Sequence, residues 1–192
     1  MGNRKEVLII IPAYNEEKTI VPVLEKLEQP EIAQIADVLV MNDASSDATN
    51  HVTKKRKHDV VTHVFNLGYG SGLQLGYKYA VRKDYRYVIQ MDADGQHDVC
   101  NIPKIYEALQ TRDENGELPD IVLGSRFMEG STDFPVSSAK KIAFAWFRTM
   151  LKLGTGRSIS DPTTGLQGLS WRTFLFIPNM ITLMINIQTQ IC

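Results

Sequence analysis

The sequence predicts an α/β sandwich, in which helices cover a mainly parallel β-sheet. Short apolar runs rich in β-branched residues alternate with longer segments whose apolar residues recur at helical spacing. Polar, turn-forming residues follow the apolar runs directly. Alternating strands and helices are typical of parallel sheets, whose functional loops lie at the carboxyl ends of the strands. A functional site is therefore expected at that edge of the sheet.

The expected strands are apolar runs that end at a polar turn, a proline or a glycine. They cover residues 7–11, 37–41, 60–65, 87–91 and 121–124. The expected helices lie between and after these strands. One runs from a cap at Asn15 to Leu27, a second follows the turn at 42–47 and ends at about Lys57, a third covers about 73–81, and a fourth runs from Pro103 to Leu109. Two further apolar helices are expected at 142–153 and 177–187. The glycines at 68, 70 and 72 are interpreted as turn and close-packing residues, because their spacing is not that of a dinucleotide-binding loop.

Composition predicts one globular domain over residues 1–192, because the chain is 43% hydrophobic and 22% charged. The net charge of −1 gives no basic excess, so no nucleic-acid partner is expected. Cys100 and Cys192 are far apart and suggest neither a disulfide framework nor a zinc site, which fits a reducing cytoplasm. His51, His58 and His63 show no partner pattern and are interpreted as structural.

Membrane contact is expected to be peripheral. No run approaches the ~20 apolar residues that a membrane-spanning helix needs. The basic run 54–58 is interpreted as the solvated end of a helix, with phosphate steering or membrane-surface binding as the alternative. The helix at 142–153, which carries basic residues beside Trp146 and Phe147, is interpreted as a core helix, with an amphipathic segment near a lipid acceptor as the alternative.

Asp92 and Asp94 are the most informative side chains, because they follow the apolar strand 87–91 directly. Two carboxylates separated by one residue can reach the same hard divalent cation, whose charge can neutralise a nucleotide diphosphate. This spacing alone is common, but other polar loops follow separate strands: Asn15 and Glu16, Asn42 and Asp43, and Asn66 and Gly68. The predicted fold brings these loops to one edge.

At this point the chain resembles family 2 glycosyltransferases of the GT-A fold, closest to the polyprenyl-phosphate glycosyltransferases typified by dolichyl-phosphate mannose synthase. The resemblance covers about residues 6–170. It rests on motifs in a fixed order: Ile11-Pro12-Ala13-Tyr14-Asn15-Glu16-Glu17, Asn42-Asp43-Ala44-Ser45-Ser46-Asp47, Asn66-Leu67-Gly68-Tyr69-Gly70, Asp92-Ala93-Asp94-Gly95-Gln96-His97, Gly124-Ser125-Arg126 and Asp161-Pro162-Thr163-Thr164-Gly165-Leu166-Gln167. Each motif is common, whereas their order and spacing together are specific.

The resemblance implies an inverting, metal-dependent glycosyltransferase with a Rossmann-like α/β/α sandwich. It would move a sugar from a nucleoside-diphosphate sugar, of the GDP-mannose or UDP-glucose type, to a polyprenyl phosphate at the cytoplasmic face of a membrane. The nucleotide-binding part would cover about residues 6–125, and the part on the acceptor side of the site would cover about residues 126–192. The implied nucleotide-sugar-binding residues are Pro12, Tyr14, Asn15, Glu16, Asn42, Asp43, Gly68, Asp92, Ala93 and Asp94.

The resemblance also implies the metal and catalytic residues. Asp92, Asp94 and Gln96 would hold Mg²⁺ or Mn²⁺ against the diphosphate. Asp94 would thereby act in catalysis, Arg126 would bind a phosphate, and Asp161 would lie near the acceptor. Simpler roles remain open, since Asn15 can merely cap its helix and Asp161 can merely begin a turn before a proline.

Departures from the family pattern leave alternatives open. Asn42-Asp43-Ala44-Ser45 stands where the family usually has Asp-Asp-Gly-Ser, so the base and the sugar are not defined. Relatives continue past the last motif, so a truncated or altered carboxyl end is expected. The alternatives are a transferase acting on a saccharide in cell-envelope polysaccharide synthesis and a sugar-nucleotide-binding protein without catalysis. A nucleotidyltransferase is disfavoured, because no glycine-rich loop follows the first strand. The sequence does not define the oligomeric state.

Overall fold

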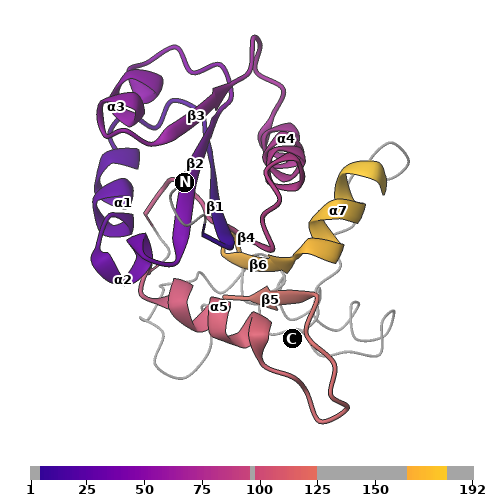
Figure 1. Ribbon diagram of the computed structural model, residues 1–192. Helices are drawn as coiled ribbons and strands as arrows, with labels where there is room; N and C mark the ends of the chain where they lie inside the picture. Colours follow the sequence, from indigo (N-terminus) through magenta and orange to yellow (C-terminus); the bar gives the residue numbers. More distant parts are fainter. Residues whose placement is uncertain (1–4, 96–97, 125–163, 181–192) are drawn as a thin grey trace, which may run out of the picture.

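The computed structural model describes residues 5–95, 98–124 and 164–180, and these form a sheet between two layers of helices (Figure 1). The sheet is 6-stranded, with the order β3-β2-β1-β4-β6-β5. Its strands are β1 (Val7–Ala13), β2 (Ala36–Asn42), β3 (Asp59–Thr62), β4 (Tyr87–Gln90), β5 (Ile121–Leu123) and β6 (Gln167–Ser170).

Most neighbouring strands run parallel, as predicted. β1 pairs in parallel with both β2 and β4, so that Ile9 lies between Val38 and Ile89, and β2 pairs in parallel with β3. β6 is antiparallel to β4 and to β5. The prediction of an α/β sandwich with a mainly parallel sheet is confirmed.

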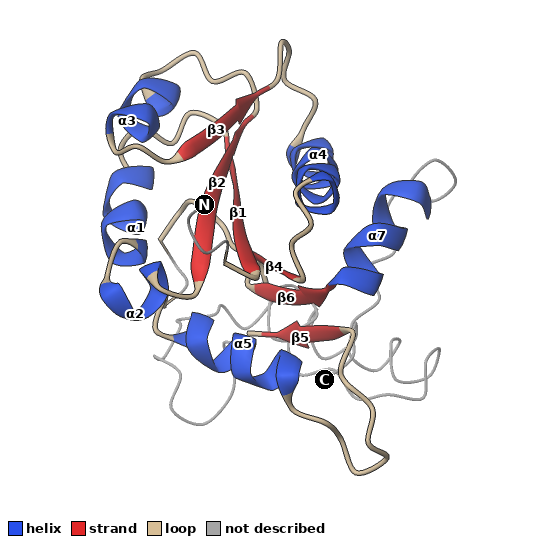
Figure 2. Cartoon of the chain, viewed as in Figure 1, coloured by secondary structure: helices blue, strands red, loops and turns tan. Residues whose placement is uncertain are grey.

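Helices cover both faces of the sheet (Figure 2). One face packs against α1 (Ile20–Leu27), α2 (Pro30–Ala33), α3 (Thr49–Lys55) and α5 (Asn101–Gln110). The other packs against α4 (Tyr69–Arg82) and α7 (Trp171–Met180). β1 is buried throughout because it contributes to both cores, with Ile9 and Ile11 on the first face and Leu8 and Ile10 on the second.

Several element boundaries differ from the sequence predictions. α1 begins at Ile20 after an N-cap at Thr19, so the expected helix cap at Asn15 is wrong. β3 ends at Thr62 rather than Phe65, which is 73% exposed. α4 begins at Tyr69, four residues earlier than expected, and α2, β6 and the start of α7 were not predicted.

Some predictions fall outside the described residues, namely the helix at 142–153, residues 181–187 of the apolar carboxyl-terminal helix, and Gln96, Arg126 and Asp161. Within the residues that the structure does describe, no helix is both long and apolar enough to span a membrane.

Candidate functional site

The loops after β1 and β2 are joined by hydrogen bonds at the carboxyl edge of the sheet. The Asn15 N–H donates to Ser45 Oγ at 3.0 Å, and the Ser46 N–H donates to Asn15 Oδ1 at 2.9 Å. Asn15 has a φ of 58°, a left-handed conformation that asparagine tolerates better than most residues. The predicted site residue Asn15 therefore holds the second loop in place rather than a helix end.

Glu17 and Asp47 reinforce this junction reciprocally. The Glu17 N–H donates to Asp47 Oδ2 at 3.0 Å, and the Ala48 N–H donates to Glu17 Oε2 at 2.9 Å. Burial alone would raise the pKa of Asp47, but hydrogen bonds from the Thr49 hydroxyl and N–H groups lower it, so the group remains a carboxylate. The sequence analysis did not predict that Glu17 and Asp47 join the two loops. The signal that could have indicated it is an acidic residue at the end of each of the two motifs.

Asp43 joins the second loop to the loop after β3. Its Oδ1 accepts from the Leu67 N–H at 2.9 Å, and its Oδ2 accepts from the Gly68 N–H at 2.7 Å. His63 Nδ1 lies 2.7 Å from Asp43 Oδ1 and must donate, because a carboxylate can only accept. Burial would raise the pKa of Asp43, but these donors together lower it.

His63 was interpreted as structural, yet it belongs to this cluster. It follows β3 directly, and its N–H continues the strand ladder by donating to the Asn42 carbonyl at 2.9 Å. Asn42 is 2% exposed, and its side chain accepts from the Ser45 N–H and donates to Thr62 Oγ1. Asn42 and Asp43 thus fix the loops around the site.

The fourth loop carries Asp92 and Asp94. The strand pairing of β4 with β1 extends to Met91, whose N–H donates to the Ile10 carbonyl at 3.1 Å. Ala93 is buried, Asp92 is half-buried, and Asp94 is exposed. Buried Ala93 thus anchors the turn, with one aspartate on each side of it in the chain.

Tyr69 and Gly165 contact Asp92 from other segments. The Tyr69 hydroxyl donates to Asp92 Oδ1 at 3.0 Å. Burial of the hydroxyl, together with the adjacent Asp92 carboxylate, raises the pKa of Tyr69, so the hydroxyl stays protonated. Gly165 lies so close that a Cβ built on it would be 1.8 Å from Asp92 Oδ2. Neither residue was singled out from the sequence, because the contacts join distant segments.

The structure therefore brings most predicted site residues to one edge. The first loop contacts the second through Asn15, the second contacts the third through Asp43, and the third contacts the fourth through Tyr69. Pro12 is buried in β1, whereas Tyr14 is 49% exposed and Glu16 is half-buried. The Glu16 side chain accepts a hydrogen bond from the Thr19 hydroxyl.

The two carboxylates of the fourth loop, Asp92 and Asp94, suit a divalent cation that is also bound by a nucleotide. Across the described segments, no group of three or more His, Cys, Asp or Glu side chains is arranged to bind a metal. Mg²⁺ characteristically binds one or two protein carboxylates and takes its remaining oxygens from phosphates and water. Asp92 and Asp94 fit that requirement.

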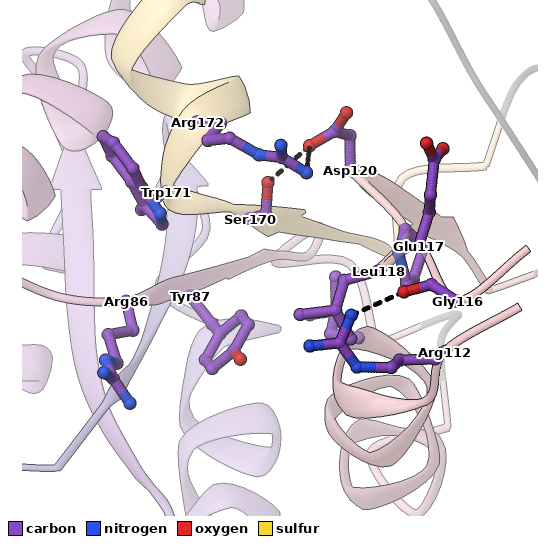
Figure 3. A pocket seen from close by; sticks show the side chains of 12 residues that line it. Arg86, Tyr87, Arg112, Gly116, Glu117, Leu118, Asp120, Ser170, Trp171 and Arg172 are labelled. Atoms are coloured by element: carbon purple, nitrogen blue, oxygen red, sulfur yellow. Dashed lines mark hydrogen bonds and ion pairs between the residues drawn. The ribbon is translucent and has the colours of Figure 1, made fainter.

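A pocket of about 660 Å³ lies at the opposite, amino edge of the sheet (Figure 3). It is bounded by the start of β4, the end of α5 and the start of α7, and none of the predicted site residues lines it. Its arginines already have protein partners: Arg86 pairs with Glu6, Arg172 pairs with Asp120, and Arg112 donates to the Gly116 carbonyl. The pocket is therefore separate from the candidate site.

Comparison with known proteins identifies the family. A family model described as "Glycosyl transferase family 2" matches residues 8–171. An undecaprenyl-phosphate mannosyltransferase of Micrococcus luteus is 30% identical over 169 residues, which cover 84% of this chain and 65% of that protein. A dolichol-phosphate mannosyltransferase of Pyrococcus furiosus is 28% identical over 170 residues, which cover 85% of this chain and 46% of that protein. The chain spans about half to two thirds of the length of the curated relatives that it matches.

The fold agrees with this match. A crystal structure of glucosyl-3-phosphoglycerate synthase from Mycobacterium tuberculosis, in complex with Mn²⁺, UDP and phosphoglyceric acid, superposes with a TM-score of 0.63 at 20% identity. The match covers 88% of this chain and 56% of that one. The predicted GT-A fold is confirmed, and the chain belongs to glycosyl transferase family 2.

Proposed function

We propose that the protein transfers a sugar from a nucleoside-diphosphate sugar to a polyprenyl phosphate, with Mg²⁺ or Mn²⁺, at the cytoplasmic face of a membrane. The observation that carries the donor half is the chain of hydrogen bonds through which Asn15, Asp43 and Tyr69 join the successive loops up to Asp92. The acceptor half is supported by the relatives named as undecaprenyl-phosphate and dolichol-phosphate mannosyltransferases.

The nucleoside would lie along the loops after β1 and β2. The half-exposed Tyr14 ring offers a flat apolar surface for a base, and Glu16 offers a carboxylate that can accept from ribose hydroxyls. Asn42 and Asp43 would act mainly by holding these loops, since both side chains are buried and already hydrogen-bonded within the protein.

Asp92 and Asp94, with Gln96 as a further proposed ligand, would hold the divalent cation. The cation would supply positive charge that stabilises the departing nucleoside diphosphate. A lipid phosphate is ionised near neutral pH, so its oxygen can attack without a strong general base. Arg126 would bind a phosphate, and Asp161 would lie near the acceptor.

Calorimetric binding tests the donor site. GDP, UDP, GDP-mannose and UDP-glucose would each be titrated into the protein with Mn²⁺ or with EDTA. We expect metal-dependent binding of one nucleotide type, abolished in Asp94→Ala because the cation loses a ligand. Glu107→Ala, which removes an exposed carboxylate on α5, is the control and should bind normally. Absence of binding in the folded wild-type protein would refute the donor half.

A transfer assay tests the acceptor half. The nucleotide sugar that binds would be incubated with undecaprenyl phosphate in detergent or with a saccharide acceptor. Formation of the lipid-linked sugar, and its loss in Asp94→Ala, is the expected result. Transfer to the saccharide alone would identify a polysaccharide-synthesising transferase, and tight binding without any transfer would identify a sugar-nucleotide-binding protein.

A further inference from the structure

We infer that Tyr69 is a positioning residue that orients the Asp92 carboxylate for the cation. This inference rests on the proposed function, because it assigns a purpose to a contact within the proposed metal site. The direct observation is the 3.0 Å hydrogen bond from the Tyr69 hydroxyl to Asp92 Oδ1. The two residues are 23 positions apart, with Tyr69 at the start of α4 and Asp92 in the loop after β4.

The backbone at Tyr69 is itself fixed by the second loop. Tyr69 is the first residue of α4, directly after Gly68, whose φ of 86° is a conformation that glycine adopts readily. The Gly68 N–H donates to Asp43 Oδ2 at 2.7 Å. Asp43 therefore fixes Gly68, Gly68 precedes Tyr69, and Tyr69 contacts Asp92. This path connects the nucleoside side of the site to the metal side.

The other Asp92 oxygen is confined as well. A Cβ at Gly165 would lie 1.8 Å from Asp92 Oδ2, so only glycine allows the approach. The segment around Gly165 is fixed because the Thr164 hydroxyl donates to the Gly124 carbonyl at 2.7 Å, and the Gly124 N–H donates to the Leu166 carbonyl at 2.9 Å. Asp92 thus lies between a hydrogen-bond donor on α4 and a tightly packed backbone before β6.

A carboxylate held in this way loses little conformational freedom when it binds a cation. Partners that orient metal ligands typically contribute about 10-fold to 100-fold to metal affinity or activity. Tyr69→Phe removes only the hydroxyl and keeps the ring. Tyr79→Phe is a matched control, because Tyr79 lies on the same helix and its hydroxyl donates to Asp59, at the start of β3 and away from Asp92.

The test separates metal affinity from nucleotide affinity. Free Mn²⁺ would be measured by electron paramagnetic resonance, with and without GDP or UDP, and nucleotide binding at saturating Mn²⁺ would be measured by calorimetry. We expect Tyr69→Phe to weaken Mn²⁺ binding about tenfold, with the nucleotide affinity at saturating Mn²⁺ and the Tyr79→Phe protein unchanged. Unchanged Mn²⁺ affinity in Tyr69→Phe would overturn the inference, and so would an equal loss of nucleotide affinity at saturating Mn²⁺.

A second variant approaches the same carboxylate from its other oxygen. Gly165→Ala should also weaken Mn²⁺ binding, because the added methyl displaces Asp92, whereas Gly70→Ala adds a methyl into open space and should not. Unaltered Mn²⁺ affinity in folded Gly165→Ala would contradict the confinement of Asp92. Mn²⁺ binding is also measured without any nucleotide. A wild-type protein that binds Mn²⁺ but no nucleotide would therefore refute the proposed function, while the comparison with Tyr69→Phe would still test the role of Tyr69.

Discussion

At the residue scale, Asp43 shows how a predicted ligand-binding residue can act by organising the site. Its side chain is 7% exposed and contacts His63 and the backbone N–H groups of Leu67 and Gly68. A buried carboxylate is stable only when such donors replace water. The loop after β3 is therefore shaped around the negative charge of Asp43.

Asp43→Asn should destabilise the protein by about 2 kcal/mol at neutral pH, because charge-assisted hydrogen bonds are lost and an amide N–H₂ faces a backbone donor. Urea unfolding of the two proteins measures the difference. Asp84→Asn is the control, since Asp84 is exposed and asparagine tolerates its positive φ. Equal stability of Asp43→Asn and wild type would show that these hydrogen bonds contribute little.

The stability difference should also depend on pH in a defined direction. Hydrogen bonding lowers the pKa of folded Asp43 below its ordinary value of 3.8, so the unfolded chain takes up the proton first as pH falls. The Asp43 contribution is therefore complete above that value and disappears as pH falls through the lowered pKa. Urea unfolding at about pH 5, 4 and 3 should show the wild type converging on Asp43→Asn. A difference that grows with acidity would contradict the assignment.

At the scale of elements, α4 connects the core to the site. Its first residue, Tyr69, contacts Asp92, while its buried positions Leu73, Tyr77 and Ala80 pack against the sheet. Gly76 allows the helix to approach β1, because a Cβ there would lie 2.8 Å from Ile10 Cγ2. The position of Tyr69 therefore depends on how closely α4 packs.

Gly76→Ala should destabilise the protein by about 1–2 kcal/mol, because overpacking against buried Ile10 exceeds the gain of about 1 kcal/mol in helix propensity. Gly70→Ala makes the same change on the same helix in open space and should be neutral or slightly stabilising. Thermal and urea unfolding of both variants provide the comparison. A Gly76→Ala protein as stable as Gly70→Ala would mean that Ile10 can move aside.

The elements that sequence reasoning predicted are those with a strong local pattern. β1 is a continuous apolar run, as expected for a strand covered on both faces. β6 was missed because Gln167-Gly168-Leu169-Ser170 contains a single large apolar side chain, and its glycine is required by packing. A Cβ at Gly168 would lie 2.4 Å from Ile105 on α5, which only the folded structure reveals.

For the candidate site too, local sequence patterns could be interpreted, but long-range contacts could not. The gathering of the loops could be predicted, because parallel strands end at a common edge. The hydrogen-bond partners of individual side chains could not be predicted. Asn15 followed by acidic residues is a helix-start pattern, but hydrogen bonds to Ser45 and Ser46, 30 and 31 positions away, fix its actual conformation. The contacts of His63 with Asp43 and of Tyr69 with Asp92 likewise join distant segments.

At the scale of the whole molecule, metal and nucleotide should stabilise the protein together more than the sum of their separate effects. Asp92 and Asp94 are two carboxylates, and the described parts of the chain contain no arrangement of three or more acidic, histidine or cysteine ligands. In the proposed site, either ligand alone would therefore find an incomplete set of partners, whereas a nucleotide diphosphate would supply the missing oxygens to the cation. Only the complex with both ligands would complete the coordination of the cation and neutralise the diphosphate.

This cooperativity can be measured by thermal unfolding with Mn²⁺, with GDP or UDP, and with both. A ligand at about 100 times its dissociation constant adds about 2.7 kcal/mol, which for a chain of this size raises the melting temperature by about 5–10 °C. We expect that shift only with metal and the preferred nucleotide together, and we expect Asp94→Ala to lose it while Glu107→Ala keeps it. A full shift with Mn²⁺ alone would instead indicate a complete protein-only metal site, and the two-carboxylate description of the site would then be wrong.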